Sequence, residues 1–234
     1  MTIDPSVYPA YAAECGDPSR TRTLGFGSRP ALVLIDVCKA YMSPNSPLAL
    51  PEDTICSTTS AIISLLQAAR TTTRNAEHET IPIFYAQTLY TNPHLRDAGM
   101  VAKKQPYAHL FSVSHPEHLT SVPDARQFPE LQPKELEMIH PKKFPSAFFG
   151  TNFATQLATL GVDTVIIAGY LTSVAVRSTA IDAMQAGFRS IAVSEACADR
   201  GHEAHWANLM DHNAKYGDVV EVEAAVEAIK RGWF

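Results

Sequence analysis

The chain of 234 residues is predicted to be an α/β protein with a doubly wound, mostly parallel six-stranded sheet between two layers of helices. Short apolar runs rich in β-branched residues alternate with longer stretches of helical periodicity, a pattern typical of consecutive βαβ units. Glycine follows several of these helical stretches, at the place where helices commonly end. In a sheet of this kind, ligands bind beyond the carboxyl ends of the strands.

An irregular arm precedes the first expected strand. Residues 1–29 are rich in Pro, Gly and Ser and show no periodic apolar pattern. Ala31–Val37 is an apolar run interrupted only by Asp36, and it predicts a buried strand. We therefore expect an N-terminal arm over residues 1–29 and a single domain over residues 30–234.

The remaining elements follow from changes in apolar periodicity between about two and 3.6 residues. Residues 88–134 are an exception, because six prolines interrupt them. A long irregular stretch of this kind is usually a functional cover. The expected helices are Thr54–Arg74, Thr151–Leu160, Ser173–Ala186, Glu203–Lys215 and Glu223–Lys230, and the later strands are Thr80–Ala86, Glu137–His140, Asp163–Gly169, Phe188–Ser194 and Asp218–Val222.

Composition excludes several classes of partner. The formal net charge is −5 and no run of Lys or Arg occurs, so we expect no nucleic acid. No apolar run approaches the roughly 20 residues that span a bilayer, so we expect no membrane. The four cysteines have neither the paired spacing of a zinc site nor a Cys-x-x-Cys motif, which favours reduced thiols in a cytoplasmic protein.

Polar residues follow two expected strands that converge on one edge of the sheet. Asp36 closes the first strand, and Lys142 follows the strand at 137–140. Alone, a strand-end acid is as often a solvated cap, and a Lys-Lys pair such as Lys142-Lys143 is most often a surface turn. The apolar stretch 144–149 argues for burial of one lysine, which then needs a carboxylate partner, and Asp36 is the natural candidate.

A third strand end lies at Gly169, followed by an expected helix that Thr172 or Ser173 could cap. The amides and the dipole of the first helical turn then point toward residue 175. Such a field favours a thiolate, so this is where a cysteine nucleophile would lie. The chain has Ala175 there. Cys38 shares the face of Asp36, but a buried structural thiol is the favoured interpretation.

Together these motifs resemble those of the isochorismatase-like cysteine hydrolases, over residues 30–220. The resemblance rests on Asp36, on Lys142 with the sequence Ser146-Ala147-Phe148, and on the turn and helix over residues 169–183. Within that family, the N-carbamoylsarcosine amidase and maleamate amidase branch has similar segments. Here those segments are Ser46-Pro47-Leu48, Asp97-Ala98-Gly99 and Glu195–Arg200.

The resemblance implies a catalytic triad of Asp36, Lys142 and the residue at 175. In that chemistry a thiolate attacks an amide carbonyl, the aspartate carries protons, and the lysine stabilises charge. The resemblance further implies a cis peptide bond between Tyr170 and Leu171. The oxyanion hole would then consist of the amides of Leu171 and Ala175. Tyr170 and Thr172 would line the pocket, and Arg200 would bind a substrate carboxylate.

The implied substrate is a small carboxylated amide or N-carbamoyl compound, cleaved at its C–N bond through an acyl-enzyme. No cofactor is expected. A metal is not expected either, because His94 stands without the family's Asp-x-His pattern and a capping or solvated role is favoured for His202, His205 and His212. The carbamoylsarcosine branch also implies a homo-oligomer, most simply a tetramer, whose subunits would cover Tyr8, Tyr11, Leu24 and Phe26 of the arm.

Ala175 predicts that this chain does not perform the covalent step. Asp36, Lys142 and the 146–148 segment are all retained, which favours a cysteine deliberately replaced to trap a ligand. A natural non-catalytic relative that binds a metabolite or a partner is the alternative. A nucleotide-binding module is disfavoured, because Gly25-Phe26-Gly27 precedes the first strand instead of following it. A purely structural protein would give no reason for charged residues at these strand ends.

Overall fold

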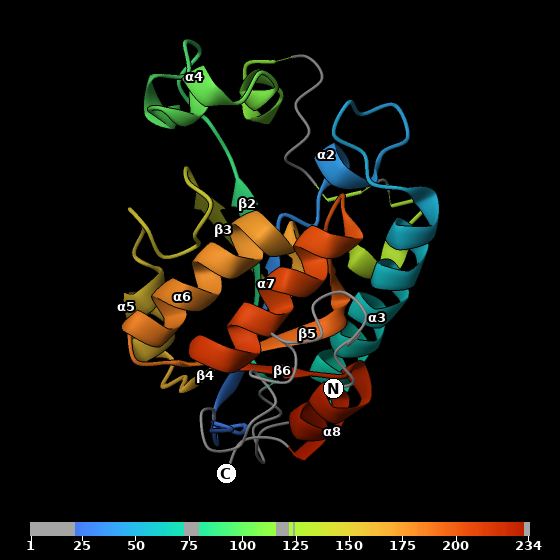
Figure 1. The fold of residues 1–234 in the computed structure, drawn as a ribbon, viewed down its shortest axis with the longest axis vertical. Coiled ribbons are helices and arrows are strands. Elements are labelled where there is room, and N and C mark those ends of the chain that lie inside the picture. Colours follow the sequence, from blue (N-terminus) through green and yellow to red (C-terminus); the bar gives the residue numbers. More distant parts are fainter. Residues whose placement is uncertain (1–21, 73–79, 116–121, 124, 232–234) are drawn as a thin grey trace.

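A computed structural model describes residues 22–72, 80–115, 122–123 and 125–231. Six strands form one sheet in the order β3-β2-β1-β4-β5-β6, and every neighbouring pair is parallel. This confirms the predicted fold class (Figure 1). The strands are β1 Pro30–Ile35, β2 Ile83–Thr88, β3 Met138–Lys142, β4 Thr164–Tyr170, β5 Arg189–Ala198 and β6 Asp218–Val220.

Helices cover both faces of the sheet, as the alternating pattern predicts. Helices α3 and α8 pack against each other and against β5 on one face. On the other face α6 contacts α7, and α5 lies beside them (Figure 1). The bounds are α2 Lys39–Met42, α3 Glu52–Thr71, α4 Val101–Lys104, α5 Phe153–Thr159, α6 Arg177–Gln185, α7 His202–Lys215 and α8 Val222–Arg231.

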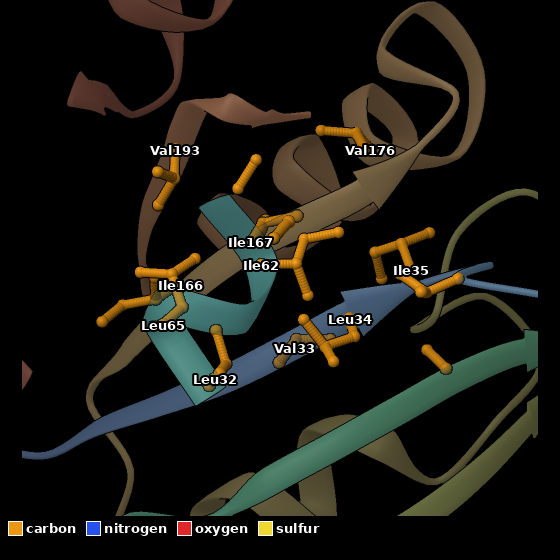
Figure 2. Packing of buried hydrophobic residues seen from close by; sticks show 14 of the residues in the cluster. Leu32, Val33, Leu34, Ile35, Ile62, Leu65, Ile166, Ile167, Val176 and Val193 are labelled. Atoms are coloured by element: carbon orange, nitrogen blue, oxygen red, sulfur yellow. The ribbon is translucent and has the colours of Figure 1, made fainter. Parts of the chain in front are cut away.

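The hydrophobic core surrounds the two central strands. Every residue of β1 and of β4 is buried, which explains why both read as continuous apolar runs and not as alternating ones. Ile62 and Leu65 of α3 pack onto these strands from one side (Figure 2). Full burial of one such aliphatic side chain contributes about 1.5–3 kcal/mol, so the central strands form a rigid support for whatever follows them.

A glycine brings the carboxyl ends of β1 and β4 unusually close. Gly169 pairs with Ile35 and has a φ of 120°, a conformation that residues with side chains rarely adopt. A Cβ atom at this position would overlap the carbonyl oxygen of Ile35. The close approach places Asp36, which follows Ile35, beside the segment that follows β4.

Residues 89–113 form a closed loop, which we call the cover, beyond the end of β2 (Figure 1). Its two ends are joined because Tyr90 N donates to Phe111 O and Val113 N donates to Tyr90 O, both at 2.9 Å. Lys143 Nζ donates to Asp97 Oδ2 at 2.7 Å, so the cover is also fixed to the end of β3. Burial opposes ionisation of Asp97, yet the Lys143 hydrogen bond lowers the pKa of Asp97 to about 2.

The described part of the N-terminal arm lies against the domain. Asp218 accepts hydrogen bonds from Leu24 N and Gly25 N, and Asp163 accepts them from the amides of residues 28 and 29. Phe26, expected to need cover from a second subunit, packs against the core of its own chain. Tyr8 and Tyr11 lie outside the described residues. Within the described ranges, no helix is both long and apolar enough to cross a bilayer.

Candidate active site

A buried acid and a buried lysine meet at the carboxyl edge of the sheet. Lys142 Nζ donates to Asp36 Oδ2 at 2.7 Å and to Thr88 Oγ1 at 2.8 Å, while Thr88 N donates to Asp36 Oδ1 at 2.8 Å. The side chains of Lys142 and Asp36 are 0% and 4% exposed. Because three different strands supply these residues, the fold fixes the pair in one geometry.

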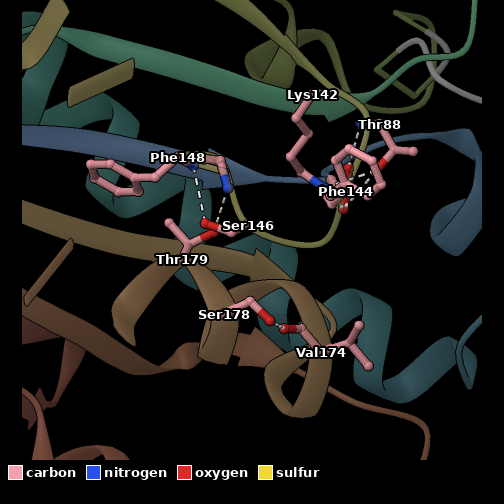
Figure 3. A network of polar contacts seen from close by, with 10 residues as sticks. Thr88, Lys142, Phe144, Ser146, Phe148, Val174, Ser178 and Thr179 are labelled. Atoms are coloured by element: carbon pink, nitrogen blue, oxygen red, sulfur yellow. Dashed lines mark hydrogen bonds and ion pairs between the residues drawn. The ribbon is translucent and has the colours of Figure 1, made fainter. Parts of the chain in front are cut away.

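The segment after β3 forms the wall next to this pair. Lys142 points toward Thr88, while the chain beyond it turns back along α6 (Figure 3). Ala147 N donates to Thr179 Oγ1 of α6 at 3.1 Å, and Phe148 N donates to Ser146 Oγ at 3.0 Å. These bonds give the Ser146-Ala147-Phe148 sequence a structural role, which is to hold the loop after Lys142 against α6.

The opposite wall is the turn after β4. The peptide bond between Tyr170 and Leu171 is cis, and a π-helical turn, Thr172–Val176, precedes α6. Val174 N and Val176 N both donate to Leu171 O, at 3.1 and 3.2 Å. Ala175 lies between these two residues and is buried against the core.

The prediction that the side chain of Thr172 or Ser173 caps this helix is wrong. Neither Thr172 nor Ser173 caps it through its own side chain. Instead Ser173 N donates to Asp199 Oδ2 at 2.7 Å. The capping carboxylate thus comes from the loop after β5, 26 residues further along the chain, where local sequence patterns carry no signal for it.

One cavity of about 350 Å³ brings together five of the predicted site residues: Asp36, Lys142, Leu171, Ala175 and Arg200. Its other walls are aromatic and aliphatic side chains of the cover and of the segments after β1 and β3. Sequence reasoning missed Thr88, although the rule that found Asp36 and Lys142 applies equally to the end of β2. The additional lining residues include Tyr41, Leu48, Thr88, Tyr90, Lys104, Tyr107, Phe111 and Phe144.

Two residues expected to line the pocket lie elsewhere. The ring of Tyr170 is buried and packs near Tyr41, with ring centroids 6.1 Å apart. Thr172 Oγ1 forms a hydrogen bond with His205 Nδ1 at 2.8 Å. Neither Tyr170 nor Thr172 is among the residues that line the cavity. The core holds the side chain of Tyr170 and α7 holds that of Thr172, so Leu171 is the residue of this segment that lines the cavity.

The lining of this cavity carries more positive than negative charge. Asp36 neutralises Lys142, and Asp97 neutralises Lys143, but no carboxylate of the described residues pairs with Arg200 or Lys104. Burial, reinforced by the Asp36 charge, raises the pKa of Tyr90 to about 12. The phenol is therefore neutral at ordinary pH and can donate a hydrogen bond. Such a cavity suits a small ligand with an anionic group.

A wider cleft of about 890 Å³ lies on the other side of Arg200. Between α3 and α7 it carries four acids and two histidines beside Trp206: Asp53, Glu195, Asp199, Glu221, His202 and His205. Trp206 Nε1 donates to His202 Nε2 at 2.8 Å. Among the residues that the structure describes, no group of three His, Cys, Asp or Glu side chains is arranged to hold a metal ion.

Other side chains near the site have structural roles. Cys38 is buried, and burial together with the Asp36 charge raises the pKa of its thiol far above the ordinary value, which does not suit a nucleophile. Arg177 Nη1 donates to Asn208 Oδ1 at 2.7 Å and lies 3.3 Å from Asp211 Oδ2. These contacts join the start of α6 to α7.

The model of the isochorismatase domain family matches residues 30–224. The maleamate amidohydrolase of Pseudomonas putida is 36% identical over 207 residues, covering 88% of this chain and 90% of that protein. An N-carbamoylsarcosine amidase from an Arthrobacter species is 28% identical over 210 residues, covering 88% and 73%. A cysteine hydrolase structure from Pseudomonas syringae superimposes with a TM-score of 0.76 at 22% identity, over 92% of this chain and 99% of the other. This chain belongs to the isochorismatase family.

Proposed function

We propose that this chain has the architecture of a cysteine-dependent amidohydrolase and lacks only the nucleophile. The observation that carries the proposal is the shared cavity. The buried Asp36–Lys142 pair, the turn that carries Leu171 and the guanidinium-bearing Arg200 line this cavity together with Ala175. The names of two relatives, maleamate amidohydrolase and N-carbamoylsarcosine amidase, support the same reaction class.

The proposed reaction requires a cysteine at position 175. Asp36 accepts the thiol proton, and the sulfur forms a bond to the amide carbonyl carbon. The amides of Leu171 and Ala175 receive the developing oxyanion, and Lys142 stabilises the ionised carboxylate of Asp36. Asp36 returns its proton to the leaving nitrogen as the C–N bond breaks. Water then attacks the thioester carbonyl while Asp36 takes its proton, and Asp36 returns this proton to the sulfur as the C–S bond breaks and the acid product leaves.

The proposed substrate is a small amide or N-carbamoyl compound with a carboxylate. Arg200 provides a planar fork of donors suited to a carboxylate, and no described carboxylate competes for it. A cavity of about 350 Å³ admits a molecule of few heavy atoms. Tyr90, Tyr107 and Phe111 form an uncharged aromatic part of the cavity lining. This part does not favour a second anionic group on the substrate.

A binding experiment on the chain as it stands tests this proposal. Because Ala175 cannot attack, maleamate and N-carbamoylsarcosine should bind in isothermal titration calorimetry without releasing ammonia. The neutral methyl esters of both compounds are the controls and should bind more weakly. Failure of every acidic amide in a broad panel to bind would contradict the proposed substrate class.

The second candidate is a natural non-catalytic protein that binds a metabolite or partner, and Ala175 itself favours it. Against it, the Asp36–Lys142 pair is buried and fully hydrogen-bonded, an arrangement that ligand binding alone does not require. We therefore favour replacement of a cysteine at position 175. The codon at this position in the source genome separates the two candidates.

We also propose that the chain forms a homo-oligomer, most simply a tetramer, in the cytoplasm. Large apolar side chains of the described residues are exposed on the surface, among them Leu136 and Phe149. A second subunit would remove such surfaces from water. The three cysteines of the described residues are free, which agrees with a reducing compartment. Light scattering that finds a monomer at micromolar concentration would contradict the assembly.

A further inference from the structure

Asp199 joins the loop after β5 to the turn that carries residue 175. One carboxylate oxygen, Oδ2, accepts the amide of Ser173 at 2.7 Å, and Oδ1 accepts the amide of Arg200 at 2.8 Å. A single side chain therefore ties the nucleophile position to the segment of the substrate-binding arginine. None of the roles assigned above to Asp36, Lys142 or Arg200 includes this contact.

Two neighbouring contacts hold the same turn from the side of α7. Thr172 Oγ1 bonds to His205 Nδ1 at 2.8 Å, and Arg177 Nη1 bonds to Asn208 Oδ1 at 2.7 Å. Both of these contacts use side chains, one from the turn and one from the first residue of α6. The Asp199 contact alone of the three engages a backbone amide inside the π-helical turn, so it acts most directly on the orientation of the peptide units on either side of Ala175.

The charge of Asp199 has a second consequence. The first amides of a helix carry a partial positive charge, which stabilises a nearby anion. Asp199 already supplies a carboxylate there, two residues before position 175. Any anion that forms or binds at position 175 must share this field with Asp199 and experiences its repulsion.

We propose that Asp199 is a positioning residue that fixes the 172–176 turn through the Ser173 amide and limits how readily an anion forms at position 175. The inference deepens the proposed function and relies on it only for the identity of the anion, a thiolate. Charged groups around this region come from several elements: Asp36 after β1, Lys142 on β3 with Lys143 after it, Lys104 of the cover, Arg177 of α6, Asp199 and Arg200 after β5, and His205 of α7.

The test uses the Ala175→Cys variant and measures alkylation by iodoacetamide against pH, which needs no substrate. Asp199→Asn keeps an oxygen acceptor for Ser173 N but removes the charge. We expect it to lower the apparent pKa of the introduced thiol, so that alkylation at pH 6.5 accelerates about 3-fold to 10-fold. The matched control is Asp53→Asn, which removes an acid from the same wide cleft without touching the turn, and it should leave the rate unchanged.

Amide hydrogen exchange in the Ala175 chain gives a second measurement. Asp199→Ala removes the acceptor, and exchange of the amides of residues 173–176 should accelerate at least about 10-fold, whereas Asp199→Asn should not change it. Equal alkylation rates in the Asp199→Asn and Asp53→Asn variants, with unchanged exchange in Asp199→Ala, would overturn the proposal. If Asp199→Ala does not fold, the alkylation comparison alone decides. If Asp199→Asn lowers the pKa of the introduced thiol as expected but the Ala175→Cys variant hydrolyses no amide, the role of Asp199 stands and the proposed function is rejected.

Discussion

The two hollows on either side of Arg200 differ in charge and in depth. The small cavity contains a fully buried ion pair, neutral phenols and two cations that no described carboxylate neutralises. The wide cleft is larger and lined by four acids, two histidines and Trp206. A carboxylated ligand is therefore attracted to one side of Arg200 and repelled from the other. In the proposed function, this asymmetry lets Arg200 orient a carboxylated ligand toward Ala175 although the arginine borders both hollows.

The charged groups of the two hollows also differ in what their hydrogen bonds hold in place. In the small cavity, hydrogen bonds among residues at the ends of β1, β2 and β3 hold the acid and the lysine in place, so the proton carrier of the proposed reaction needs no ligand to position it. In the wide cleft, Glu195 receives bonds from Ser194 and from the amide that begins α8, which are structural tasks. Chemistry should thus depend on the small cavity, and stability at low pH on the wide cleft.

The largest expected effect is at Ala175. Ala175→Cys should produce hydrolysis of a carboxylated amide at least about 1000-fold faster than the unchanged chain, because a triad without its nucleophile loses several orders of magnitude. A coupled assay of ammonia release measures this. Ala175→Ser is the control, since a hydroxyl is a far weaker nucleophile here. Equal rates for both variants would place the chemistry outside this cavity.

Two adjacent lysines, Lys142 and Lys143, allow the stability contribution of a buried ion pair to be compared with that of a partly exposed one. Lys142→Met strands the Asp36 carboxylate in a dry site and should cost about 3–5 kcal/mol of unfolding free energy. Lys143→Met breaks a pair whose side chains are 29% and 22% exposed, so it should cost about 1 kcal/mol or less. Urea unfolding measures both. Similar losses would mean that the Lys142 pair is no more buried in solution than its neighbour.

Arg200 tests the charge difference between the two hollows. Arg200→Ala should weaken binding of acidic amides by about 10-fold to 100-fold, the range of one charge-assisted hydrogen-bonded contact, and leave their neutral esters nearly unaffected. Calorimetry on the Ala175 chain measures both ligands. Lys104→Ala, at the exposed mouth of the cavity, should have a smaller effect. Equal losses for acidic and neutral ligands would assign Arg200 a structural role.

The smallest effect concerns acid stability of the wide cleft. Burial lowers the pKa of His205, which faces the cleft, to about 4 from 6.5. Between pH 6.5 and 4 the unfolded chain binds this proton and the folded chain does not, so stability falls as pH falls. The slope is up to about 1.4 kcal/mol per pH unit.

Urea unfolding at pH 7, 6 and 5 measures that slope. His205→Asn should flatten it by about one proton and retain an acceptor for Thr172. His212, a buried residue of the same helix α7, also has a pKa lowered to about 4 by burial and remains as an internal reference. An unchanged slope in the variant would mean that His205 is protonated in the folded chain.

Sequence patterns predicted the sheet well because its strands are buried on both faces. The continuous apolar runs that became β1 and β4 leave no alternative to a central position. The predicted ends of the strands were less accurate. Strand β2 begins at Ile83 and not at Thr80, and β5 continues to Ala198, beyond an irregularity in its register with β4. Helix α2 is four residues long and has too little periodicity to be detected.

The candidate site was predicted where it depends on strand ends and missed where it depends on distant partners. The Asp36–Lys142 pair follows from topology, because parallel strands share a carboxyl edge. The cap on Ser173 does not, since Asp199 lies on another loop. Likewise the partner of Thr172 is His205 of α7, and this contact, which removes Thr172 from the cavity, leaves no mark in the local sequence.

Gly169 also constrains how this scaffold can diversify. Because Gly169 has no side chain, its backbone lies directly against that of Ile35, so β1 and β4 approach closely at this end. The spacing between Asp36 and the 172–176 turn depends on that approach. A change of substrate that required a longer reach across this gap would first have to separate two central strands. Adaptation to a new ligand is therefore confined to the cover and to Arg200, whose side chains can be exchanged while the distance between the two halves of the site stays the same.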